Sequence, residues 1–114
     1  MDVSGKKAIV FGGTSGIGLE IAKDVVARGD NVVLSGRDLA HAQEVAASLG
    51  PSATGVAVDL SAPETIKAGL AGVGTVNGLV IAAIERDANT VRDYDFERAR
   101  RLVTLKLVGY TETI

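Results

Sequence analysis

The chain has 114 residues, of which 46% are hydrophobic, a net charge of −2 and no cysteine. This length holds one domain with a buried core, and the charge balance gives no electrostatic basis for binding nucleic acid or an anionic membrane. Without cysteine the chain forms neither disulfides nor a thiolate metal site. It has no apolar run of about 18 residues and no signal-peptide core, so we expect a cytoplasmic protein without membrane partners.

Short apolar runs alternate with helical spacings along the chain. The short runs predict buried strands at residues 7–11, 31–35, 54–58 and 76–83. The helical spacings predict helices at residues 16–28, 38–49, 61–70 and from 92 to the C-terminus. This order predicts an α/β fold, a Rossmann-like parallel sheet of strand order 3-2-1-4 with helices on both faces.

Particular residues mark the ends and the buried faces of the helices. Gly29 should stop the first helix, Asp38 should cap the second, and Ser61-Ala62-Pro63-Glu64 fits a capping box for the third. The spacing predicts these packing residues: Ile17, Ile21, Val25 and Val26 in the first helix, and Phe96, Ala99, Leu102, Val103 and Leu107 in the last.

A glycine-rich turn joins the first strand to the first helix. Gly12, Gly16 and Gly18 are spaced G-x-x-x-G-x-G, which lets backbone N–H groups approach a phosphate at a helix N-terminus. A side chain at Gly12 or Gly16 would obstruct the turn or the ligand, and one at Gly18 would obstruct helix–strand packing. The strand–turn–helix context indicates that residues 1–114 form one dinucleotide-binding domain. The alternative is a glycine-rich turn that binds no ligand.

The second strand ends in Ser35-Gly36-Arg37, where an NAD-binding unit usually carries a carboxylate for the ribose 2′-hydroxyl. Gly36 stands at that position, and the guanidinium of Arg37 can pair with a 2′-phosphate. This favours NADP over NAD, and the alternative is a surface arginine beside Asp38. Asp59, just past the third strand, is expected either to contact the adenine or to be a loop carboxylate that competes with Ser61 as the helix cap.

These segments resemble the N-terminal half of the short-chain dehydrogenase/reductase family. Residues 11–18 are similar to its T-G-x-x-x-G-I-G motif, Arg37 to its NADP-type second strand, and Asp59-Leu60 to its adenine-contacting pair. The resemblance implies hydride transfer between NADP(H) and the carbonyl or alcohol carbon of a small molecule. It implies cofactor contacts at Gly12, Thr14, Ser15, Gly16, Ile17, Gly18, Ser35, Gly36, Arg37, Asp59, Leu60 and Ala82.

The chain departs from the family pattern at several positions. Phe11 replaces the usual Thr, and Ile81-Ala82-Ala83-Ile84 replaces N-N-A-G after the fourth strand. Thr104 occupies the position of the family's helix Asn, or is an ordinary helix residue. Neither Tyr94 nor Tyr110 begins a Tyr-x-x-x-Lys pair, so both are expected to be amphipathic helix residues and no complete catalytic set is expected within the chain.

These features are consistent with two functions, an enzyme and a non-catalytic module. The chain stops inside a predicted helix, so we expect the truncated cofactor half of a longer reductase, inactive alone. The alternative is a non-catalytic nucleotide-binding or interaction module. The open edge of the fourth strand predicts a homo-oligomer. We expect no metal at the single histidine, His41, a solvated turn at Glu85-Arg86-Asp87, and a solvated helix face at Arg98, Arg100 and Arg101.

Overall fold

The computed structural model describes residues 6–83 and 92–114. Its elements in order are β1 (Lys7–Phe11), α1 (Gly16–Ala27), β2 (Asn31–Gly36), α2 (Leu39–Leu49), β3 (Ala53–Ala57), α3 (Glu64–Gly69), β4 (Gly78–Ile81), α4 (Phe96–Val103), the π-helix η2 (Thr104–Gly109) and α5 (Tyr110–Thr113). The strands are parallel in the order β3-β2-β1-β4, with Val10 level with Leu34 and Val80. The predicted sheet order is therefore confirmed.

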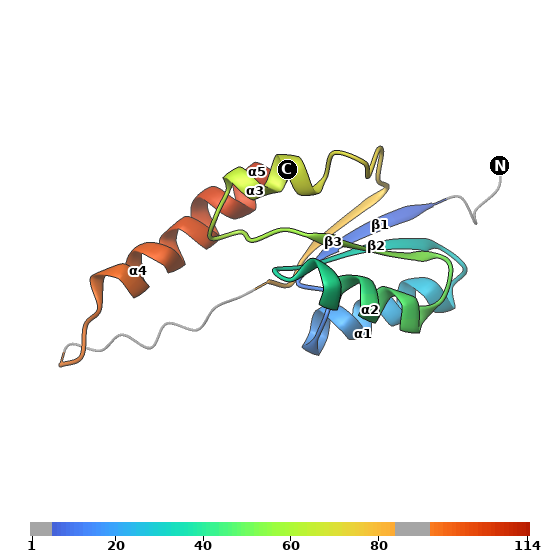
Figure 1. Cartoon of the computed structure of the whole chain (residues 1–114), viewed down its shortest axis with the longest axis horizontal. Helices are drawn as coiled ribbons and strands as arrows, with labels where there is room; N and C mark the ends of the chain where they lie inside the picture. The colour runs from blue at the N-terminus through green and yellow to red at the C-terminus, as the bar shows by residue number, and fades with distance from the viewer. Residues whose placement is uncertain (1–5, 84–91) are drawn as a thin grey trace.

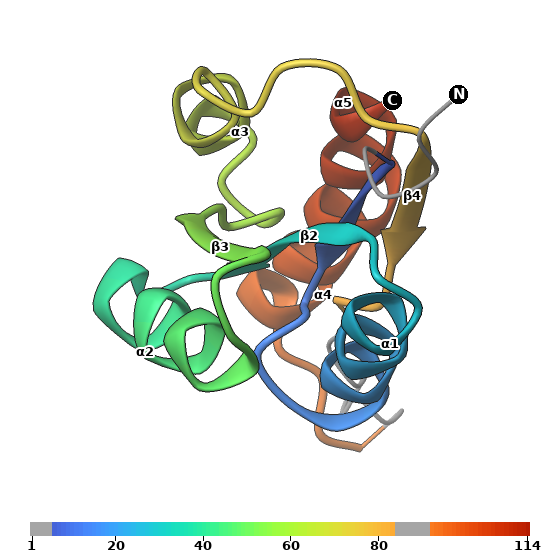
Figure 2. The same ribbon diagram turned by 90° about the vertical axis from the view of Figure 1, so that its right-hand side faces the viewer.

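Helices cover both faces of the sheet, as predicted. Figure 2 shows α1 and α2 against one face, and α3 with the C-terminal helix over the other. Alternate residues of β1 supply the two cores: Val10 packs on the α1/α2 side, whereas Ile9 and Phe11 pack with Ile66 of α3 and Leu105 of η2. Each core buries one face of the same strands, which fixes the register of the sheet.

Local chemistry sets most element ends. Gly29 and Gly50 end α1 and α2 with φ of +85° and +112°, and the Asp38 carboxylate accepts a 3.3 Å hydrogen bond from the His41 backbone N–H. The predicted capping box at Ser61 is wrong. Pro63 is the N-cap residue of α3, and the Ser61 hydroxyl donates instead to Asp59 Oδ1 at 2.6 Å.

The C-terminal helix differs from its predicted form. It starts at Phe96 rather than at residue 92. The Asp95 carboxylate caps this start by accepting hydrogen bonds from the N–H groups of Glu97 and Arg98. Among the predicted packing residues, Ala99 and Leu102 are half-buried, but three are exposed: Phe96 (62%), Val103 (58%) and Leu107 (66%). The residues that pack deeply are Leu105 and Gly109 of η2.

The molecule is elongated because this helix runs obliquely away from the sheet (Figure 1), giving principal extents of 55 × 24 × 23 Å. Gly109 permits its close approach, since a Cβ there would strike the Leu60 carbonyl oxygen. In α1, Val25 is buried as predicted but Ile17 is 78% exposed, so Ile17 is not a packing residue. Within residues 6–83 and 92–114, no helix has the length and apolarity to cross a bilayer.

Candidate functional site

A cavity of about 450 Å³ lies at the carboxyl ends of the strands, where open α/β sheets bind ligands. Every residue that the sequence predicts to contact a cofactor lines this cavity. The full lining is Gly12, Thr14, Ser15, Gly16, Ile17, Gly18, Ser35, Gly36, Arg37, Val58, Asp59, Leu60, Ala82, Ala83 and Leu105. Val58, Ala83 and Leu105 were not predicted from the sequence.

The first half of the glycine-rich turn is bound to the end of β2. The backbone N–H groups of Gly12 and Gly13 both donate to the Ser35 carbonyl oxygen, at 3.2 and 3.1 Å, and Gly12 N also lies 3.4 Å from Ser35 Oγ. Ser35 is only 2% exposed, so these bonds are shielded from water. The Gly12 amide is therefore occupied, and the amides left for a ligand are those nearer α1.

The three glycines of the motif have different roles. Gly12 has φ of +80°, and a Cβ there would lie 2.6 Å from the backbone nitrogen of Ala83; a Cβ at Gly18 would strike the Gly12 carbonyl oxygen. Gly12 and Gly18 are thus required for packing. Gly16 has φ of +58°, and apart from its chain neighbours and the backbone of α1, no atom of the described residues lies within 4 Å of a Cβ added there. Gly16 therefore faces open space at the start of α1.

The N-terminus of α1 carries no side-chain cap among the described residues. Its N-cap residue, Ser15, makes no capping hydrogen bond, and its first turn holds no acidic residue. In contrast, Asp38 and Asp95 cap α2 and α4. The first-turn N–H groups of a helix have no intrahelical acceptor and carry the positive end of the helix dipole, so this end of α1 favours an anion.

Two charged residues border the cavity beyond the turn. Arg37 follows β2, is exposed, and forms no ion pair with another residue of the described part of the chain. Asp59 Oδ1 accepts hydrogen bonds from Ser61 N at 2.9 Å and Ser61 Oγ at 2.6 Å. Its own N–H donates to Thr65 Oγ1 at 3.0 Å. Asp59 therefore organises the loop into α3 while it also lines the cavity.

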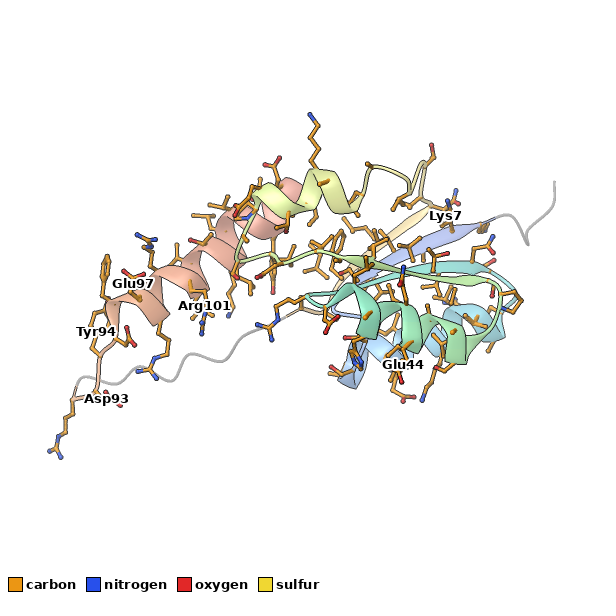
Figure 3. The ribbon with its side chains drawn as sticks, in the orientation of Figure 1. Lys7, Glu44, Asp93, Tyr94, Glu97 and Arg101 are labelled. Carbon is orange, nitrogen blue, oxygen red and sulfur yellow. The ribbon has the colours of Figure 1, made fainter. Side chains whose placement is uncertain are left out.

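The C-terminal helix closes one wall of the cavity. Leu105, 8% exposed, lines the cavity, and the Tyr110 hydroxyl donates a 2.6 Å hydrogen bond to the Ala83 carbonyl oxygen. Tyr110 is thus a half-buried helix residue, as predicted. Tyr94 precedes α4 and lies at the end of that helix farthest from the sheet (Figure 3), so the prediction of a helical Tyr94 is wrong.

Thr104 does not line this cavity. It lines a separate groove of about 560 Å³ beside Ser61 and the arginines of α4. The predicted turn at Glu85-Arg86-Asp87, and Ile84, lie outside the described residues. Leu105 was not predicted because its burial depends on how its own C-terminal helix crosses the sheet. That crossing is set by contacts with residues distant in sequence, for which the sequence near residue 105 carries no signal.

The sequence model for short chain dehydrogenases matches residues 6–114. The chain belongs to the short-chain dehydrogenase family. It is 36% identical over 109 residues to a 3-beta-hydroxysteroid dehydrogenase of Comamonas testosteroni, an alignment that covers 90% of this chain and 43% of that protein. The chain spans less than half the length of the curated relatives it matches.

Solved structures of the family have the same fold. A short chain dehydrogenase/reductase family protein superimposes with a TM-score of 0.89 at 33% identity, over 99% of this chain and 48% of that one. A 3-ketoacyl-(acyl-carrier-protein) reductase from Brucella melitensis complexed with NADH gives 0.82 at 31% identity, over 98% and 48% of the two chains.

Proposed function

We propose that this chain forms the cofactor half of an NADP(H)-dependent oxidoreductase of the short-chain dehydrogenase/reductase type. The observation that carries the proposal is the uncapped N-terminus of α1, which opens at Gly16 onto a cavity bordered by Arg37. NADP carries both groups that this arrangement would bind, a pyrophosphate at the helix end and a 2′-phosphate beside Arg37.

The residues present fit a dinucleotide. The N–H groups of Gly16, Ile17 and Gly18 would hold the pyrophosphate, because Gly16, which adopts a positive φ that favours glycine, has no side chain to cover the helix end. Asp59 and Leu60, with Val58, would bind the adenine. Thr14, Ser15, Ser35 and Ala82 complete the proposed contacts along the cavity.

The NADP preference rests on Gly36 and Arg37. Gly36 supplies no carboxylate to accept a hydrogen bond from a ribose 2′-hydroxyl or to repel a 2′-phosphate. Arg37 supplies a planar guanidinium that can pair bidentately with phosphate oxygens. We therefore place NADP ahead of NAD.

The bound nicotinamide would supply or accept a hydride at a carbonyl or alcohol carbon of a small-molecule substrate. The residues of this chain would bind and orient that cofactor. The sequence holds no Tyr-x-x-x-Lys pair to move the substrate proton, and Tyr110 already donates its hydroxyl to Ala83. We therefore propose that the 114 residues alone are inactive.

A non-catalytic nucleotide-binding module is the second candidate, favoured by the position of Thr104 outside the cavity. The test is NADPH oxidation with a panel of carbonyl compounds, by this chain and by any longer natural form that contains it. The proposal predicts turnover by the longer form only. A longer form that binds NADPH but turns over none of the panel would favour the module.

A homo-oligomer is a further part of the proposal. β4 lies at the edge of the described sheet, and Leu79 on this strand is 41% exposed. An open strand edge presents N–H and C=O groups that another chain can pair with.

A further inference from the structure

Thr14, in the glycine-rich turn, lies against Gly36 at the end of β2. A Cβ added at Gly36 would lie 2.9 Å from Thr14 Cγ2 and 3.3 Å from Thr14 Oγ1. Carbon atoms in favourable contact are about 3.5–4.0 Å apart, so a side chain at residue 36 would collide with the Thr14 methyl group. Both residues line the candidate cofactor cavity.

The backbones on both sides of this contact are held in place. Ser35 accepts the N–H groups of Gly12 and Gly13 through its carbonyl oxygen, which ties the turn to β2. A Cβ at Gly13 would lie 2.7 Å from Leu34 Cβ, so the turn is also packed against the strand. On its other side, Gly36 accepts a 2.9 Å hydrogen bond from the Val58 N–H. With both backbones fixed, a side chain at residue 36 could be accommodated only by a movement of the Thr14 side chain.

The collision lies at the end of β2, where a Rossmann unit distinguishes NAD from NADP. Val32 and Leu34 point toward α1 and α2, and residue 36 points the same way because side chains alternate along a strand. In a Rossmann unit, a carboxylate at the end of the second strand binds the ribose 2′-hydroxyl of NAD. A carboxylate at residue 36 of this chain would first have to displace Thr14.

We propose that Thr14 is a specificity-determining residue, which keeps a carboxylate out of position 36 and so leaves cofactor selection to Arg37. This inference rests on the proposed function. It predicts that Gly36→Asp alone does not raise the affinity for NADH above that of the wild-type chain. Conversion also requires Thr14→Ala, because the remaining Cβ of residue 14 would lie 3.7 Å from the new Cβ, which is an ordinary contact.

The first arm of the test is calorimetric titration of NADH and NADPH into the 114-residue chain and its variants. Thr14→Ala/Gly36→Asp should bind NADH at least about tenfold more tightly than Gly36→Asp, the change expected when about 1.4 kcal/mol of overpacking is relieved. The matched control is Thr14→Val/Gly36→Asp, which keeps two γ atoms at residue 14. It should bind NADH no better than Gly36→Asp.

The second arm needs no nucleotide. Gly36→Ala should lower Tm by about 4 °C or more, and Thr14→Ala, but not Thr14→Val, should restore it. Equal rescue by Ala and Val, or tight NADH binding by Gly36→Asp alone, would overturn the inference.

The two arms separate this inference from the proposed function. A wild-type chain that binds neither nucleotide would overturn the proposed function, and the specificity role with it, whatever the Tm values show. A wild-type chain that binds NADPH, together with a Gly36→Ala variant of unchanged Tm, would overturn the role of Thr14 alone.

Discussion

The Tyr110 hydroxyl donates a 2.6 Å hydrogen bond to the Ala83 carbonyl oxygen and so ties the C-terminal helix to the end of β4. Tyr110→Phe should lower the free energy of unfolding by about 0.5–1.5 kcal/mol, because the bond is half-buried and the ring remains. Urea denaturation followed by circular dichroism measures this change.

The matched control is Tyr94→Phe. Tyr94 is 62% exposed, and its change should stay within about 0.5 kcal/mol. Equal changes in the two variants would mean that the Tyr110 bond contributes nothing to the attachment of the helix.

Leu105 and Leu107 lie two residues apart on the C-terminal helix but differ in burial, at 8% and 66% exposed. Leu105→Ala should cost about 2–5 kcal/mol, since it opens a cavity in the core formed with Ile9, Phe11 and Ile66. Leu107→Ala should cost at most about 0.5 kcal/mol. The same denaturation experiment measures both, and the reverse order of losses would show that the helix packs by its other face.

The sequence predicted the sheet because its signals are local. Gly29, Asp38 and Gly50 mark element ends through backbone conformation or capping, and apolar runs mark the buried strands. β1 and β2 therefore agree with prediction to within one residue, whereas β4 is shorter than predicted, at Gly78–Ile81.

The C-terminal helix shows where such signals fail. Apolar residues lie on both of its faces, with Phe96, Val103 and Leu107 exposed and Leu105 buried. Apolar spacing alone cannot choose between two apolar faces. The choice is made by contacts distant in sequence, such as Gly109 against the Leu60 carbonyl. The Ser61 cap failed for a related reason, because the Asp59 carboxylate takes the hydroxyl that the cap would need.

Gly18→Ala tests the packing of α1 on the turn. Alanine would gain about 0.5–1 kcal/mol of helix propensity, but its Cβ would strike the Gly12 carbonyl oxygen, and overpacking against backbone costs about 1–3 kcal/mol or more. We expect a net loss of stability and a lower Tm in thermal denaturation. Gly72→Ala is the control, since the described residues leave open space around its Cβ. A Gly18→Ala chain as stable as wild type would contradict the proposed close approach.

β4 is an edge strand of the described sheet, which predicts self-association of the chain. Sedimentation velocity at increasing concentration should show species larger than the monomer, and Leu79→Lys should reduce them by placing a charge on the edge strand. Leu39→Lys, at a residue of α2 that is 47% exposed, should have little effect. A wild-type chain that stays monomeric at high concentration would rule out the edge as an interface.

We propose that NADP(H) binds at the start of α1 with its 2′-phosphate beside Arg37. The most direct measurement is calorimetric titration of NADPH and NADH into the wild-type chain, Arg37→Glu, and the control Arg28→Glu, whose residue lies outside the cavity. We expect the wild-type chain to bind NADPH one-to-one and more tightly than NADH. Arg37→Glu should weaken NADPH binding about tenfold or more, whereas its NADH binding and the binding of both cofactors by the control should change little. Equal losses for the two cofactors, or no NADPH binding by the wild-type chain, would contradict it.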